Sequence, residues 1–340
     1  MKKIFAVLLI LLLLCGCAQA PRQTQPTEPK NNTVGICLPS FNWHGQAQEL
    51  TRLLEAQGFQ VLVEYAGDDV QRQGEQIQTF VNMPVGCIVL VAIDGMRLSD
   101  ALEDARQENV PVIAYDRLPT YTQGVTGLVA ADSYTAGQAM AKYIVETKQL
   151  DTAEKPVSVE FFMDTPESYS SILLYQGVMD TLQPYLSSGV LYCPSGRTAF
   201  EDVCVPDGTG DTASERLFDQ LAETGKAPQV LCTASDALAA GCIDALASYG
   251  MNPEEKTWPL VTGMGADSDA LDYIDMNYQS MTLFVDGEAL LKQCAQWVVK
   301  AMEGVPLTGT MQDNGVTQVP CALQPPTRVD TSNYEEYIVE

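Results

Sequence analysis

The sequence is poor in histidine and in basic residues, and each shortage excludes a class of function. His44 is the only histidine, and 44 acidic residues stand against 19 Lys and Arg, which gives a formal net charge of −25. Binding to nucleic acid needs clustered Lys and Arg, so a nucleic-acid partner is not expected. The same shortage argues against adhesion to anionic lipid by charge. An acidic surface of this kind keeps a secreted protein soluble.

The signatures of common enzymes and of metal sites are also missing. There is no G-x-S-x-G nucleophile elbow and no P-loop. With one histidine and no C-x-x-C pair, a zinc site is not expected. We therefore predict that the protein is not an enzyme, and that it has no cofactor and no bound metal.

Most of the cysteines after Cys17 lie in apolar runs such as "GCIVLV" and "VLCTA", which is typical of small core residues. Cys193 and Cys204 flank a stretch that resembles a loop. They are the one pair for which we consider a disulfide, and the sequence leaves that question open.

The N-terminus carries a targeting signal. Lys2 and Lys3 precede an apolar run that has the length of a signal peptide and is short for a membrane-spanning helix. The run ends in "LCGC", which resembles a bacterial lipobox and so implies cleavage before Cys17 and a lipid on Cys17. An uncleaved anchor or an ordinary signal peptide are the alternatives. We expect residues 1–16 to be the signal peptide and residues 17–32 to be a lipidated, proline-rich tether.

The rest of the chain alternates short β runs with amphipathic helices. This alternation indicates parallel sheets that are covered by helices. It occurs about ten times, which is too many for one small sheet, so an α/β protein with two doubly wound lobes is expected. The expected strands are near residues 33–38, 59–65, 86–92, 110–115, 125–132, 157–163, 189–193, 229–234, 259–264 and 280–285. The expected helices are near residues 45–58, 69–81, 98–108, 136–147 and 288–303, with others ending near 182, 249 and 277. Asp68 and Asp69 can cap the second of these helices.

Polar residues stand directly after several of these strands. In open α/β sheets ligands bind beyond the carboxyl ends of the strands. The positions are Asp116-Arg117, Asp132-Ser133, Ser235-Asp236 and Asp267. For the last three, a helix follows at once, so N-capping is an equally good explanation. Asp116-Arg117 is followed by Pro119 and turn residues, which makes it the best candidate for ligand binding.

Four segments carry a resemblance to a known family. "VPVIAYDRL", "VAADSYTAGQAMA", "TASDALAAGCIDALASYG" and "DNGVTQVPCAL" resemble the xylose-type and multiple-monosaccharide branch of the type I periplasmic sugar-binding proteins. Those proteins are the substrate-binding components of ABC transporters. The resemblance covers residues 33–337 and implies two Rossmann-like lobes joined by three hinge strands, with sugar bound between them. It implies a lobe of residues 33–130 and 283–318, and another of residues 131–282 and 319–340.

The resemblance also implies a set of ligand contacts. A carboxylate accepts and a guanidinium donates hydrogen bonds, so Asp116 and Arg117 would bracket neighbouring sugar hydroxyls. Trp43 would cover an apolar face of the ring, with plain core packing as its alternative. In the second lobe, the expected contacts are Ser170, Ser235 and Asp236.

The sequence departs from the family pattern on the side opposite Asp116. Gly265 stands where a sugar-binding aspartate is expected, and Ser235 where an asparagine is usual. Val285 replaces a lysine or similar polar residue. In residues 201–216, which we expect to form a loop, Gly208 falls near the expected stacking tryptophan. The fold prediction is untouched by these changes, but the identity of the ligand is left open.

Together these observations predict an extracytoplasmic solute-binding lipoprotein, anchored on the outer face of the cell membrane. It would capture a small polyhydroxylated ligand, a monosaccharide or similar, and deliver it to an ABC permease. The alternative is a sensory or interaction lipoprotein of the same fold, with a degenerate pocket, that signals to a membrane partner.

Overall fold

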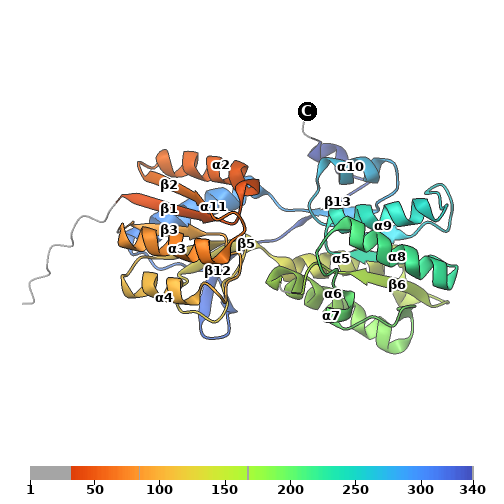
Figure 1. The fold of residues 1–340 in the computed structure, drawn as a ribbon. Coiled ribbons are helices and arrows are strands. Elements are labelled where there is room, and N and C mark those ends of the chain that lie inside the picture. Colours follow the sequence, from red (N-terminus) through yellow and green to blue (C-terminus); the bar gives the residue numbers. More distant parts are fainter. Residues whose placement is uncertain (1–31, 84, 167, 339–340) are drawn as a thin grey trace, which may run out of the picture. The chain divides into compact units, whose positions relative to one another are not determined.

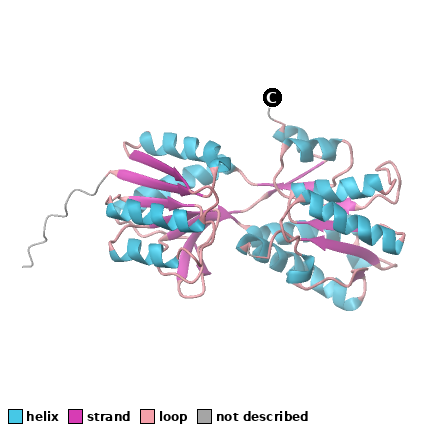
Figure 2. Cartoon of the chain, viewed as in Figure 1, coloured by secondary structure: helices cyan, strands magenta, loops and turns pink. Residues whose placement is uncertain are grey.

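The structure is a computed structural model, and it describes residues 32–83, 85–166 and 168–338 (Figure 1). The predicted signal peptide and Cys17 lie outside the described residues. In the described part, helices alternate with strands along most of the chain (Figure 2). The strands form two larger sheets and one two-stranded ribbon. We call the seven-stranded sheet with its helices the first lobe, and the four-stranded sheet with the ribbon and its helices the second lobe.

The first lobe is built on a mostly parallel sheet with the strand order β11-β12-β5-β4-β3-β1-β2. Its strands are β1 (Thr33–Leu38), β2 (Gln60–Tyr65), β3 (Cys87–Leu90), β4 (Val112–Tyr115), β5 (Gly127–Ala131), β11 (Thr310–Asp313) and β12 (Gln318–Gln324). Only β11 runs antiparallel to its neighbour. All residues of β3 and β4 are buried, as expected for central parallel strands covered on both faces.

Helices cover both faces of this sheet. The helices are α2 (His44–Glu55), α3 (Val70–Asn82), α4 (Ser99–Gln107) and α11 (Gly287–Glu303). Residues of α2 and α11 share one apolar cluster with the sheet, and residues of α3 and α4 share another. In α2 the buried residues Ala47, Leu50 and Leu54 recur at helical spacing. Asp69 caps α3 by accepting hydrogen bonds from the backbone N–H groups of Gln71 and Arg72, as its position before the helix predicted.

The second lobe has a parallel sheet with the order β7-β6-β8-β9 and an antiparallel ribbon of two strands. Its strands are β6 (Val157–Phe162), β7 (Leu191–Tyr192), β8 (Val230–Thr233), β9 (Leu260–Val261), β10 (Met281–Phe284) and β13 (Thr327–Asp330). Its helices are α5 (Ser133–Lys148), α6 (Tyr169–Ser188), α7 (Phe200–Val203), α8 (Gly210–Thr224), α9 (Asp236–Ser248) and α10 (Ser268–Asp275). One apolar core, with Phe161 and Phe162 fully buried, joins most of them, and Leu271 and Ile274 of α10 form a separate small cluster with Val329 of β13.

Two helix pairs of the second lobe pack through glycine. A Cβ added to Gly137 on α5 would lie 1.9 Å from the carbonyl oxygen of Leu174 on α6, and one added to Gly177 would lie 2.1 Å from that of Tyr134. Gly241 on α9 approaches the backbone of α8 in the same way. Because only glycine lets two helix backbones come this close, these positions fix the distance between the helices.

The chain passes between the lobes at three points, as the resemblance implied. β5 leads into α5, β10 leads into α11, and β12 leads through Pro325 and Pro326 into β13. The prediction differs from the structure at the last passage. Residues 319–324 were expected in the second lobe, but they belong to β12, which pairs with β5 in the first sheet.

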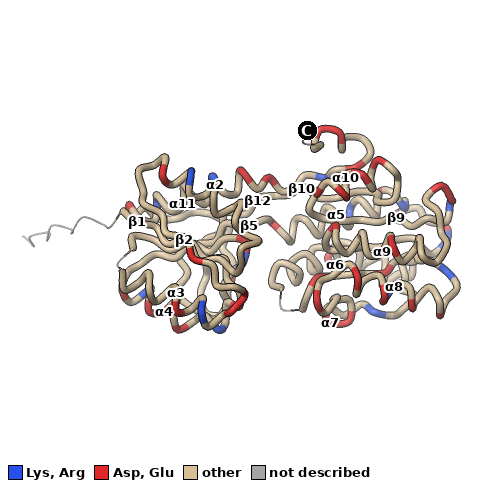
Figure 3. The backbone as a smooth tube through the Cα atoms, turned by 45° about the horizontal axis from the view of Figure 1, so that its top comes forward, with Lys and Arg blue, Asp and Glu red and all other residues tan. Residues whose placement is uncertain are grey.

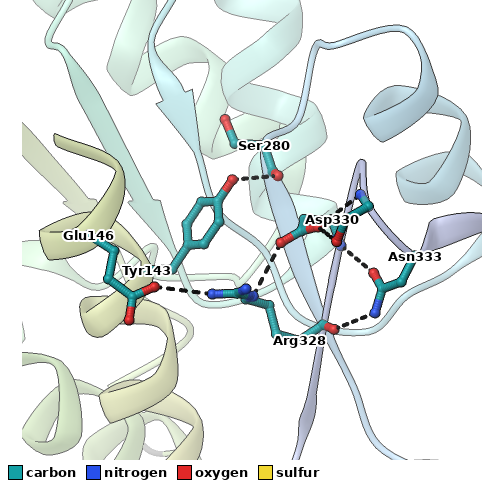
Figure 4. Close-up of polar contacts among 7 residues, drawn as sticks. Tyr143, Glu146, Ser280, Arg328, Asp330 and Asn333 are labelled. Carbon is teal, nitrogen blue, oxygen red and sulfur yellow. Dashed lines mark hydrogen bonds and ion pairs between the residues drawn. The ribbon is translucent and has the colours of Figure 1, made fainter.

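The third passage is fastened inside the second lobe by Arg328 of β13 (Figure 4). Its guanidinium forms ion pairs with Glu146 of α5 at 3.2 Å and with Asp330 at 3.1 Å. It also lies over the ring of Tyr143, whose hydroxyl donates to the carbonyl oxygen of Ser280. Arg328 therefore ties the strand of the third passage to the helix that follows the first.

Two further elements differ from prediction. The segment around residues 201–216 was interpreted as a loop, but it contains α7 and the start of α8. Helix α6 was expected to end near residue 182, but it continues through Pro184 to Ser188 and ends at Gly189, which has a positive φ.

Candidate functional site

Asp116 and Arg117 follow β4 at the carboxyl edge of the first sheet. Asp116 has a φ of +67°, a left-handed conformation that Asp and Asn tolerate better than most residues. Its N–H donates to the carbonyl oxygen of Val129 on the neighbouring strand, and the N–H of Arg117 donates back to that of Tyr115. The left-handed residue turns the chain sharply out of the sheet. No helix begins here, so neither side chain is used as a cap.

The two side chains form an ion pair that stays open to solvent. Arg117 Nε lies 3.7 Å from Asp116 Oδ2, and the side chains are 48% and 45% exposed, respectively. Arg117 Nη1 also donates to the carbonyl oxygen of Ala92 at 3.2 Å, which holds the guanidinium against the end of β3. Partial loss of water around the carboxyl raises the pKa of Asp116, and the nearby Arg117 opposes this shift.

An aromatic ring lies beside this ion pair. Trp43 ends the 3₁₀ helix η1 (Phe41–Trp43), packs edge-on against Tyr115 at 6.3 Å, and lies 5.9 Å from the Arg117 guanidinium carbon. Trp43 thus contacts both the core of the first lobe and the predicted site. The sequence did not single out Phe41, whose side chain is 67% exposed and stacks on His44 at 4.4 Å. The sequence did contain a signal for it, because an aromatic residue in the turn just after a predicted strand is a candidate for ligand contact.

In the second lobe, Ser235 is the N-cap of α9, and its hydroxyl accepts a hydrogen bond from the N–H of Leu238. Ser235 therefore acts as a helix cap, which was the alternative that the sequence left open. Ser170 lies in the first turn of α6 and is half-buried. Its neighbour Ser171 is buried, and its hydroxyl has no hydrogen-bond partner among the described residues.

Asp236 differs most from its predicted role. The residue is only 4% exposed, and both carboxylate oxygens are occupied. They accept hydrogen bonds from the N–H of Ala266, from Gln279 Nε2 and from the Thr282 hydroxyl at 2.6–2.9 Å. Burial raises the pKa of Asp236, while these donors lower it. The carboxylate holds the chain after β9 to β10, which is a structural role and not the predicted ligand contact.

The position of Asp236 explains one of the departures from the family pattern. A Cβ added to Gly263 would lie 2.1 Å from Asp236 Oδ1, and one added to Gly265 would lie 3.0 Å from Oδ2. Gly265 also has a φ of +142°, which side chains rarely allow. The Asp236 carboxylate therefore lies against the backbone of two glycines, and a side chain at Gly265, such as the aspartate of the family pattern, would be strained by this backbone conformation and would press on Asp236.

Two carboxylates at strand ends were not singled out from the sequence. Asp94 follows β3, and its Oδ1 accepts hydrogen bonds from the N–H groups of Met96 and Arg97. Asp164 follows β6, and its Oδ1 accepts from the N–H of Thr165 at 2.8 Å. Each stands just after an apolar run, the same signal that identified Asp116.

Other classes of site find no support in the described part of the chain. No group of three or more His, Cys, Asp or Glu residues is placed to hold a metal there. The eight described cysteines form no disulfide with one another, so none joins Cys193 to Cys204, and all but Cys193 are buried, as predicted for most of them. Residues 32–83, 85–166 and 168–338 contain no helix with the length and apolar character needed to cross a membrane.

Three comparisons place the chain among known proteins. Residues 36–305 match the family model of the periplasmic binding protein domain. The chain is 30% identical to the multiple sugar-binding periplasmic protein SbpA of Azospirillum brasilense, over 93% of this chain and 91% of that protein. It is 31% identical to the multiple sugar-binding periplasmic receptor ChvE of Rhizobium radiobacter, over 91% and 89%.

Among solved structures, an ABC transporter solute-binding protein from Clostridium phytofermentans with bound β-D-glucose has 31% identity and a TM-score of 0.81. The match covers 90% of this chain and 96% of that one. The myo-inositol-binding protein of Caulobacter, at 19% identity and a TM-score of 0.70, shares the fold. The predicted two-lobed fold and the predicted resemblance are confirmed, and the chain belongs to the periplasmic binding protein family, in its type I form.

Proposed function

We propose that the protein is a solute-binding protein that captures a sugar with Asp116, Arg117 and Trp43 and delivers it to an ABC permease. The observation that carries this proposal is the open ion pair at the end of β4. Its guanidinium is held by the carbonyl oxygen of Ala92 and lies next to the ring of Trp43, and both side chains remain about half exposed. The relatives named for binding multiple sugars, and the related structure with bound glucose, support it.

The chemistry of the site suits a polyhydroxylated ring. Each sugar hydroxyl both donates and accepts, so one hydroxyl can bridge Asp116 and Arg117. The indole of Trp43 offers an apolar face for the C–H groups of the ring. We propose that Ser170 and the second lobe complete the contacts, so that the ligand favours a closed form in which both lobes touch it.

A titration of the full chain with D-glucose, D-xylose and myo-inositol, followed by calorimetry, tests the binding proposal. A ligand present at a hundred times its Kd should stabilise the folded form by about 2.7 kcal/mol and raise the melting temperature accordingly. Small-angle scattering should show a smaller radius of gyration with the ligand. Failure of all three compounds, and of a wider panel of sugars and polyols, would contradict the proposal. Binding without a smaller radius of gyration would contradict only the proposed closure of the lobes on the ligand.

We propose further that the mature protein is held on the outer face of the membrane by lipid on Cys17. The "LCGC" sequence and the proline-rich tether support this location. Cys17→Ser should move the protein from the membrane fraction to the soluble extracytoplasmic fraction. A variant that stays with the membrane would show that Cys17 is not the anchor.

A further inference from the structure

Asp164 of the second lobe is a half-buried carboxylate that accepts few hydrogen bonds from the protein. Asp164 stands two residues beyond β6, at the carboxyl edge of the sheet, and is half-buried. Within the described residues it accepts one hydrogen bond, from the N–H of Thr165, and it takes part in no ion pair. A carboxylate that has lost part of its water needs donors to replace it, so Asp164 is poised to accept hydrogen bonds from outside the protein.

The neighbouring loop is shaped around this carboxylate. Gly208 has a φ of +66°, and a Cβ added there would lie 2.3 Å from Asp164 Oδ1. The N–H of Gly208 donates to the carbonyl oxygen of Val205, which fixes the loop in this conformation. The Asp164 carboxylate can therefore occupy this position only because residue 208 is a glycine. A side chain at Gly208 would displace it.

The same turn leads to a polar group that has no hydrogen-bond partner among the described residues. The N–H of Ser168 donates to the carbonyl oxygen of Thr165, and the Ser168 hydroxyl caps α6 by accepting from the N–H of Ser171. The Ser171 hydroxyl is buried and unpartnered, as described above. By contrast, the carboxylate of Asp236 in the same lobe is saturated by protein donors.

We propose that Asp164 is the specificity-determining contact of the second lobe, and that it accepts hydrogen bonds from a donor group of the ligand, either a sugar hydroxyl or the ammonium of an amino sugar. The inference rests on the proposed sugar-binding function and names a residue and a chemistry for it. Arg117 pairs with Asp116, whereas no described Lys or Arg forms an ion pair with Asp164, so the charge of this carboxylate is not neutralised by a side chain. A ligand rich in donors complements it.

The test compares D-glucose and D-glucosamine in calorimetric titrations of the full chain. Asp164→Asn keeps the oxygen that accepts from Thr165 but removes the charge, so folding should be preserved and the melting temperature should stay close to that of the wild type. Affinity should fall at least about tenfold, the loss expected for one charge-assisted hydrogen bond. An equal loss for both sugars assigns the contact to a hydroxyl. A loss at least tenfold greater for glucosamine assigns it to the ammonium.

Asp207→Asn is the matched control, because it removes the same charge from the neighbouring loop, at the residue before Gly208. The Asp207 carboxylate accepts hydrogen bonds from Thr209 and Thr212 at the start of α8, so its loss should leave sugar affinity unchanged. Gly208→Ala should weaken binding by displacing the Asp164 carboxylate, and should weaken it less when Asp164→Asn is already present. If the wild type binds either sugar and Asp164→Asn binds it equally well, the role of Asp164 is overturned and the sugar-binding function stands. If the wild type binds no sugar at all, both fall.

Discussion

Asp116 in the first lobe and Asp236 in the second lie at equivalent points in the sequence pattern, each near the end of a buried strand. Their surroundings differ. Asp116 is turned out of the sheet by a left-handed residue and shares its charge with a half-exposed arginine. Asp236 starts a helix and is enclosed by a backbone N–H, an amide and a hydroxyl. Figure 3 shows acidic residues spread over both lobes, so charge alone distinguishes neither.

The difference shows that a carboxylate at a strand end is available to a ligand only if the protein leaves its lone pairs unused. The oxygens of Asp236 already accept hydrogen bonds from Ala266, Gln279 and Thr282. Asp116 has a single weak ion pair at 3.7 Å. We therefore expect that changes at Asp236 act on folding and that changes near Asp116 act on binding.

The largest effect is expected from Asp236→Ala. Removal of the carboxylate leaves the N–H of Ala266, the amide of Gln279 and the hydroxyl of Thr282 without their acceptor in a buried site. Each unsatisfied donor costs roughly 1–3 kcal/mol, so the free energy of unfolding should fall by about 3 kcal/mol or more in guanidinium titrations. Asp116→Ala is the control and should change it little. If Asp236→Ala folds as stably as the wild type but binds no sugar, Asp236 is the ligand contact that the sequence predicted.

Arg117→Ala tests the other side of the comparison. It removes charge-assisted hydrogen bonds to the ligand, each worth roughly 1.5–3 kcal/mol, so sugar affinity should fall at least about tenfold in calorimetry. Arg117→Lys should not restore it, because one ammonium cannot reproduce the planar fork of donors. An unaltered Kd together with a lower melting temperature would instead show that Arg117 only stabilises the contact between the ends of β4 and β3.

The glycines give a smaller but sharper comparison between the lobes. Gly137→Ala would place a Cβ 1.9 Å from a backbone oxygen of α6, and overpacking of this kind destabilises proteins by about 1–3 kcal/mol. Gly45 on α2 has open space around its Cβ position. Gly45→Ala should therefore stabilise the first lobe by about 0.5 kcal/mol through helix propensity. The melting temperature should fall for Gly137→Ala and rise for Gly45→Ala. Equal changes would show that the close approach of α5 and α6 does not depend on glycine at position 137.

Most of the fold was predictable from the sequence, because hydrophobic periodicity and helix caps are local signals. The strands that end at Leu90 and Tyr115, and the cap at Asp69, were found in this way. Helix α8 was missed, because Gly210 and the preceding glycine-rich stretch read as a loop. Its glycine is explained only by the contact with Gly241 on another helix, which no local pattern contains.

The open ion pair of the first lobe could be anticipated from the sequence, whereas the contacts of Asp236 in the second lobe could not. Asp116 and Arg117 stood out because no helix follows them, which is visible in the sequence. The structural role of Asp236 depends on Gln279 and Thr282, which lie more than forty residues away, and so could not be inferred from its own neighbourhood. The pairing of Asp164 with Gly208 is likewise a contact between two loops.

The smallest effect we expect is the pH dependence of stability that comes from Asp116. Its pKa is raised above the ordinary value of 3.8 because water around the carboxyl is reduced, so the folded state holds this proton more tightly than the unfolded state. The resulting stabilisation is fully present below pH 3.8 and is lost as the pH rises through the raised pKa. At neutral pH the ionised group is therefore slightly unfavourable without ligand, by less than about 1 kcal/mol, since nearly half of the side chain is in solvent.

Asp116→Asn should melt slightly above the wild type at pH 7, and the difference in melting temperature should close as the pH falls towards 3.8. The same variant should lose sugar affinity at pH 7. If it melts below the wild type at pH 7, the pair with Arg117 stabilises the fold more than loss of water destabilises it, and Asp116 resembles Asp236 more closely than the geometry indicates.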